Sequence, residues 1–79
     1  MPKYIKLIWD MNGPESRTMA EHYTKHLGEF MEREDLEHFG MGVEQTGDLH
    51  SFAYLVVDEK DMIKVRDALK PHRGQEAEL

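Results

Sequence analysis

Two apolar stretches decide the fold of this chain: YIKLIW at residues 4–9 and FAYLVV at residues 52–57. Both are rich in β-branched and aromatic residues, and both carry apolar side chains at odd and at even positions. A strand that exposes one face to solvent alternates apolar and polar residues, so this pattern indicates strands covered on both faces. A chain of 79 residues with two helices covers only one face of a sheet. We expect the other face to contact a second copy, a ligand or a nucleic acid.

The composition limits the class of protein. Residues 1–79 form a single domain, and a chain this short buries only about 60% of its unfolded surface, so association would add stability. Sixteen acidic residues against ten Lys and Arg give a net charge of −6, which disfavours nucleic acids and anionic lipids as partners. The absence of cysteine excludes disulfides and thiolate catalysis. Because no signal peptide and no apolar run of membrane length are found, we expect a soluble cytoplasmic protein.

The first half of the chain predicts a strand and a helix. The strand covers residues 3–10, and the segment Asn12-Gly13-Pro14 ends it. The helix covers residues 15–34, because Pro14 suits the start of a helix and apolar residues recur behind it at helical spacing. The apolar face of this helix consists of Met19, Ala20, Tyr23, Leu27, Phe30 and Met31.

The second half predicts a hairpin and a second helix. Residues 38–45 and 50–57 form strands that pair antiparallel across a turn at Thr46-Gly47-Asp48. Asp58 caps the second helix, which ends near Lys70 because Pro71 follows. Residues 71–79 have little strand character.

This order of elements predicts a ferredoxin-like α+β sandwich, with an antiparallel sheet and both helices on one face. A right-handed crossover makes the first two strands parallel and places the third strand between them. The arrangement usually ends with a fourth strand beside the first. Here we expect that strand to be short or missing, which would leave the first strand as an exposed edge unless the tail or a second subunit covers it.

The hairpin register predicts which side chains face the helices. With Gly42 opposite Phe52 and Gly40 opposite Tyr54, each aromatic ring covers a cross-strand glycine. The side chains directed at the helices are then Phe39, Met41, Val43, Ala53, Leu55 and Val57. The predicted ligand- or partner-binding face, directed away from the helices, contains Tyr4, Ile8, His50, Phe52, Tyr54 and Val56. An apolar patch of this kind is typical of an interface or groove, with a plain surface patch as the alternative.

Histidines and a basic segment are the candidate chemical groups. His26 lies beside the apolar face of the first helix, so we expect it to be half-buried and able to act as a general base if a carboxylate orients it. His22 and His26 are four residues apart and would hold a metal only with a third ligand, so no metal site is predicted. Arg66, Lys70 and Arg73 are a candidate anion site, although cations also favour a helix C-terminus for electrostatic reasons. No motif for a cofactor is present.

The segment HSFAYLVV at residues 50–57 partly resembles the RNP1 motif of RNA-recognition domains. Phe52, Ala53, Tyr54 and Leu55 match that motif, whereas a basic residue, a glycine and an aromatic residue are missing from the other positions. In that family the aromatic side chains of this strand stack on bases. The resemblance implies single-stranded RNA binding through Phe52 and Tyr54, which the acidic composition opposes.

Over most of its length the chain resembles the small dimeric α+β-barrel proteins, including the YCII-related domains. The step His26-Leu27 is similar to a His-Leu step on the first helix of YCII-related domains, where that histidine and an aspartate are suspected active-site groups. Asp48 is the candidate for the aspartate here. The resemblance implies two subunits that pack their open sheet faces together.

From these patterns we predict a homodimeric module that binds a small ligand or a partner on its open sheet face. One alternative is a small enzyme of the dimeric α+β-barrel type with His26 as general base. A second alternative is single-stranded RNA binding through Phe52 and Tyr54.

Overall fold

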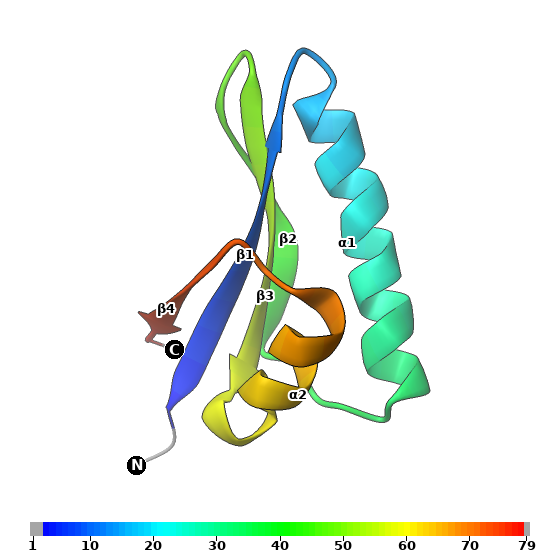
Figure 1. Ribbon diagram of the computed structural model, residues 1–79, viewed down its shortest axis with the longest axis vertical. Helices are drawn as coiled ribbons and strands as arrows, with labels where there is room; N and C mark the ends of the chain where they lie inside the picture. The colour runs from blue at the N-terminus through cyan, green and yellow to red at the C-terminus, as the bar shows by residue number, and fades with distance from the viewer. Residues whose placement is uncertain (1–2, 79) are drawn as a thin grey trace.

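A computed structural model describes residues 3–78 and consists of two layers, a four-stranded antiparallel sheet and two helices on one side of it (Figure 1). The predicted α+β class is confirmed. In chain order the elements are β1 (Tyr4–Asn12), α1 (Ser16–Arg33), β2 (Gly40–Gly47), β3 (His50–Asp58), α2 (Glu59–Leu69) and β4 (Arg73–Ala77). No helix within these residues is long and apolar enough to cross a membrane.

The strands lie in the order β2-β3-β1-β4, and every neighbouring pair is antiparallel. The two apolar stretches are therefore the central strands, β3 and β1, as predicted. The fourth strand is short and present: β4 pairs with β1 from Tyr4 opposite Ala77 to Ile8 opposite Arg73. Of the two alternatives that the sequence left open, a short strand or a missing one, the structure shows the short strand, and the tail covers the β1 edge from Tyr4 to Ile8. Strand pairing satisfies backbone groups whatever the side chains are, so a tail with low strand propensity still completes the sheet.

The register of the β2–β3 hairpin differs from the predicted one by two residues. Gly42 lies opposite Tyr54 and Gly40 opposite Val56, while Phe52 faces Glu44. The strands continue closer to the turn than predicted, and a bulge between residues 45 and 47 accommodates the extra residue. Because the shift is an even number of residues, the side chains within the paired strands keep the sheet face that the sequence predicted.

The hydrophobic core lies between the sheet and the helices. The sheet contributes Leu7, Trp9, Ala53, Leu55 and Val57, and the helices contribute Ala20, Leu27, Phe30, Met31 and Val65. Met19 is 42% exposed, contrary to its predicted place on the apolar face of α1. The first turn of α1 instead buries Ser16, whose hydroxyl donates to the buried Ser51 hydroxyl at 3.1 Å.

The second helix begins and ends as its sequence predicts. The Asp58 carboxylate accepts a hydrogen bond from the Lys60 backbone N–H at 3.0 Å. At the other end Lys70 adopts the left-handed conformation, with φ of 47°, and its N–H donates to the Arg66 carbonyl. The left-handed conformation of Lys70, followed by Pro71, turns the chain back toward the sheet. The next segment, β4, then pairs with β1.

Candidate functional site

The sheet face directed away from both helices, here called the outer face, contains all six residues of the predicted binding face. The register places Ile8 beside Tyr54 on one side and Arg73 on the other. Side chains alternate along each strand, so every second residue of β1, β3 and β4 lies on this face, beside residues of β2. Its members on these strands are Tyr4, Lys6, Ile8, Asp10, His50, Phe52, Tyr54, Val56, Arg73 and Gln75.

This face is not the uncovered apolar patch that the sequence predicted. Ile8, Phe52 and Val56 are only 2%, 6% and 6% exposed in the single chain. The Lys6 Nζ lies 4.5 Å from the Tyr54 ring centroid and 5.5 Å from that of Phe52, and the Arg73 guanidinium lies 5.5 Å from the Phe52 ring. Long cationic side chains cover apolar surface with their aliphatic parts while their charge interacts with aromatic rings. The surface is therefore covered by its own polar residues.

Aromatic rings remain accessible nearer to the β2 side of the outer face. The Tyr4 and Phe39 rings pack edge to face with centroids 4.7 Å apart, and Phe39 is 37% exposed. Phe39 was predicted to face the helices, and this prediction is wrong. Its position precedes the first residue of β2, Gly40, so strand alternation does not determine its direction. The half-buried Tyr54 ring lies over Gly42.

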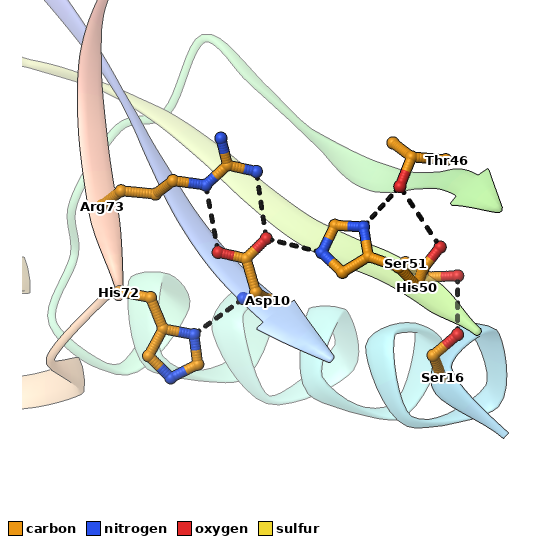
Figure 2. A network of polar contacts seen from close by, with 7 residues as sticks. All are labelled: Asp10, Ser16, Thr46, His50, Ser51, His72 and Arg73. Carbon is orange, nitrogen blue, oxygen red and sulfur yellow. Dashed lines mark hydrogen bonds and ion pairs between the residues drawn. The ribbon is translucent and has the colours of Figure 1, made fainter. Parts of the chain in front are cut away.

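Four polar side chains form a cluster at one end of the outer face, here called the Asp10 cluster (Figure 2). Arg73 donates from Nε to Oδ2 of Asp10 and from Nη2 to Oδ1, each at 3.0 Å. The Nε2 of His50 lies 2.8 Å from the same Oδ1, and its Nδ1 contacts the Thr46 hydroxyl. Asp10, Thr46, His50 and Arg73 come from β1, β2, β3 and β4, so every strand of the sheet contributes one residue.

The protons of the Asp10 cluster can be assigned from its charges. The hydrogen bonds from Arg73, together with the contact with His50, hold the pKa of the Asp10 carboxyl below its ordinary value despite partial burial. An ionised carboxylate only accepts hydrogen bonds, so the Nε2 of His50 carries a hydrogen and donates to Asp10. In the neutral imidazole, Nδ1 is then an acceptor, and the Thr46 hydroxyl donates to it.

A second histidine fixes the backbone of this cluster. The Nδ1 of His72 accepts from the Asp10 backbone N–H at 2.8 Å, and the His72 backbone N–H donates to the Ile8 carbonyl at 2.9 Å (Figure 2). These bonds extend the contact between β1 and the β4 segment beyond the last regular strand pair. His72 therefore positions Asp10 without touching its carboxylate.

The other predicted chemical groups are brought together only in part: Arg66 and Arg73 both border a hollow between α2 and β4, which Lys70 does not line. His26 is exposed on α1, in the helical layer, so the expectation that it is half-buried against the sheet is wrong. Arg66 bonds the adjacent Asp67, Lys70 ends α2, and the Arg73 guanidinium is directed to the outer face by Asp10. Within residues 3–78, no group of three or more His, Cys, Asp or Glu side chains has the arrangement of a metal site.

The Asp10 cluster itself was missed by sequence reasoning. His50 was predicted on the outer face and residue 10 at the end of the first strand, but no local pattern determines the register between β1 and β3 that brings them together. Arg73 lies in a tail with no strand signal, and Thr46 was placed in a turn. Comparisons of the chain with protein-family models, with curated proteins and with solved structures found no match.

Proposed function

We propose that this protein is a small binding module that uses the outer face to bind a small ligand beside the Asp10 cluster and to associate with a second copy of itself. The observation that carries the proposal is the Asp10 cluster, in which all four strands place a polar side chain at one point of the face that no helix covers. Such convergence of polar groups beside aromatic rings is typical of ligand sites.

The cluster keeps hydrogen-bonding capacity for a ligand. Arg73 uses Nε and Nη2 toward Asp10, which leaves the Nη1 donors, and its side chain is 52% exposed. The Thr46 hydroxyl is exposed, and the His50 side chain is partly exposed. A ligand with oxygen acceptors would therefore meet preformed donors, while the half-buried Tyr54 ring offers an apolar contact.

Association through the same face is supported by the two-layer architecture. The order of elements and strands fits the ferredoxin-like arrangement, in which one sheet face lacks a covering layer. The resemblance to dimeric α+β-barrel proteins leads to the same expectation. Because Lys6 and Arg73 already cover the centre of the face, we expect the contact to depend on Tyr4, Phe39 and Tyr54.

Light scattering coupled to size exclusion at micromolar concentrations tests the association. We expect the mass of two chains, and a shift toward the mass of one chain in Tyr54→Ser. The control is Ile63→Ser, which removes a side chain of α2 that is 55% exposed in the helical layer. A single-chain mass for the unmodified protein throughout this range would contradict the dimer.

A second candidate function is general acid–base catalysis at the same face, with His50 in the role that the sequence assigned to His26. The contacts of His50 with Asp10 and Thr46 favour it, because an oriented imidazole next to a hydroxyl can remove the hydroxyl proton. Nitrogen-15 NMR of the imidazole rings tests the arrangement. We expect the Nε2–H tautomer of His50, and a mixture of tautomers in Asp10→Ala. The Nδ1–H tautomer in the unmodified protein would exclude this arrangement.

A further inference from the structure

A separate hollow lies on the other side of the sheet, between α2 and β4. Its volume is about 410 Å³, within the range of roughly 300–1,000 Å³ that is typical of small-molecule sites. We call it the α2–β4 groove. The residues that line it are Ile5, Leu7, Met62, Arg66, Pro71, Arg73, Gly74, Gln75 and Glu76.

The groove exists because α2 packs over β1 and β3 but not over β4. On β4 the residue directed at the helical layer opposite Leu7 is Gly74, which has no side chain to fill the space. A Cβ atom built at Gly74 would lie 3.4 Å from Leu7 and 3.7 Å from Ile5. The floor of the groove is therefore formed by the apolar side chains of Ile5 and Leu7 beside the Gly74 backbone, and Met62 of α2 forms another wall.

Each end of the groove has a charged side chain that is already part of an ion pair. Arg66 lies one helical turn after Met62 on α2, its side chain is 53% exposed, and only its Nε bonds, to the adjacent Asp67. The Arg73 guanidinium is held on the outer face by Asp10, so Arg66 is the cation that remains for a ligand. At the other end Glu76 lies opposite Ile5 and pairs with Lys3 at 3.7 Å.

We propose that the α2–β4 groove binds a small amphiphilic monocarboxylate, with its apolar part over Ile5 and Leu7 and its carboxylate at Arg66. The fork of a guanidinium matches the two oxygens of a carboxylate, whereas at the opposite end the Lys3 charge is already paired with Glu76. Arg66 therefore favours an anion at its own end of the groove. The site lies across the sheet from the outer face and does not depend on the function proposed for that face.

Sodium octanoate is the test probe, and 1-octanol is the uncharged comparison. In titrations of the nitrogen-15-labelled protein, we expect octanoate to shift the backbone amide signals of Ile5, Leu7, Met62 and Gly74. Arg66→Gln should weaken octanoate binding roughly three- to five-fold, the size expected for a partly exposed ion pair, and should leave octanol binding unchanged. Gly74→Ala, which reduces the hollow, should weaken the binding of both probes.

Lys60→Gln is the matched control. It removes one positive charge from the same helix at a position that does not line the groove, and should leave octanoate affinity unchanged. Three results would overturn the proposal: octanoate shifts confined to the outer face, equal octanoate affinity in Arg66→Gln and Lys60→Gln, or groove signals that move on dilution without octanoate. The last result would assign the groove to a second copy of the chain.

Discussion

The Nε2 of His50 lies 2.8 Å from the Oδ1 of Asp10, on the neighbouring strand, and Arg73 holds the same carboxylate from the opposite strand through two bonds of 3.0 Å. The carboxylate thus links the three strands β3, β1 and β4. The side-chain contact adds to the backbone pairing of β4 with β1, on a strand whose side chains are mostly exposed. The Asp10 cluster is therefore the candidate site, and it also links the side chains of β4 to those of β1.

We expect Asp10→Asn to lower the free energy of unfolding at neutral pH, because Arg73 and His50 lose an ionised partner. In the unmodified protein the pKa of Asp10 is lowered from its ordinary value near 3.8, chiefly by the Arg73 hydrogen bonds. A lowered pKa gives stability that is present above the unfolded-state pKa and is lost as the pH falls through the folded-state pKa.

The stability difference between the unmodified protein and Asp10→Asn should therefore be constant around neutrality and decrease below about pH 4. Urea unfolding at a series of pH values measures it. The control is Asp48→Asn, at an exposed turn residue for which the described residues provide no ion pair. A difference that grows on acidification would show that the pKa shift has the opposite sign.

The buried hydroxyls of Ser16 and Ser51 should behave as a coupled pair. Each serine is at most 1% exposed, and the hydroxyl–hydroxyl bond of 3.1 Å links α1 to β3. Ser51→Ala should cost about 1–2 kcal/mol, because it leaves the Ser16 hydroxyl buried without this partner. The double variant Ser16→Ala/Ser51→Ala should cost less than the two single variants together. Chemical denaturation of all four proteins measures the coupling, and additive costs would disprove it.

Gly42→Ala should displace the Tyr54 ring. A Cβ atom at residue 42 would lie 2.9 Å from the Tyr54 hydroxyl oxygen, which is closer than real contacts allow, and 3.2 Å from the ring carbon that bears this hydroxyl. Gly47→Ala is the matched control on the same strand, because nothing lies within 4 Å of a Cβ there. We expect the first variant to be less stable than the second by about 1 kcal/mol. Ring-proton chemical shifts of Tyr54 should change only in Gly42→Ala; unchanged shifts would contradict the proposed contact.

The Trp9 indole should contribute more to stability than the Tyr23 hydroxyl, although both donate to the Leu69 carbonyl. The Trp9 bond is 2.9 Å long and the residue is 3% exposed, whereas the Tyr23 bond is 3.3 Å long. Trp9→Phe also leaves a core cavity, so we expect a cost of about 2–3 kcal/mol. Tyr23→Phe should cost about 1 kcal/mol or less. Thermal and urea unfolding of Trp9→Phe and Tyr23→Phe measure the loss of unfolding free energy in each variant. Equal losses would show that the indole hydrogen bond and the lost side-chain volume contribute little.

Most of the fold was predictable because its signals are local. Apolar runs marked β1 and β3, helical spacing marked α1, and Asp58 and Pro71 marked the ends of α2. The fourth strand lacked such a signal, since residues 73–77 pair through their backbone. The sequence also did not predict that Phe52 is covered. Lys6 and Arg73 place their cationic groups over its ring, whereas charged residues on a strand are normally expected to extend into solvent.

The sequence by itself determined the two central strands, the helices that cover one side of the sheet, and the face on which each strand residue lies. These follow from periodicity, which needs only near neighbours along the chain. Only the tertiary structure decided that Asp10 meets His50 and Arg73, and that a hollow opens beside Gly74. Those contacts depend on the register between strands distant in sequence, and register is set by the packing of the whole domain rather than by any one segment.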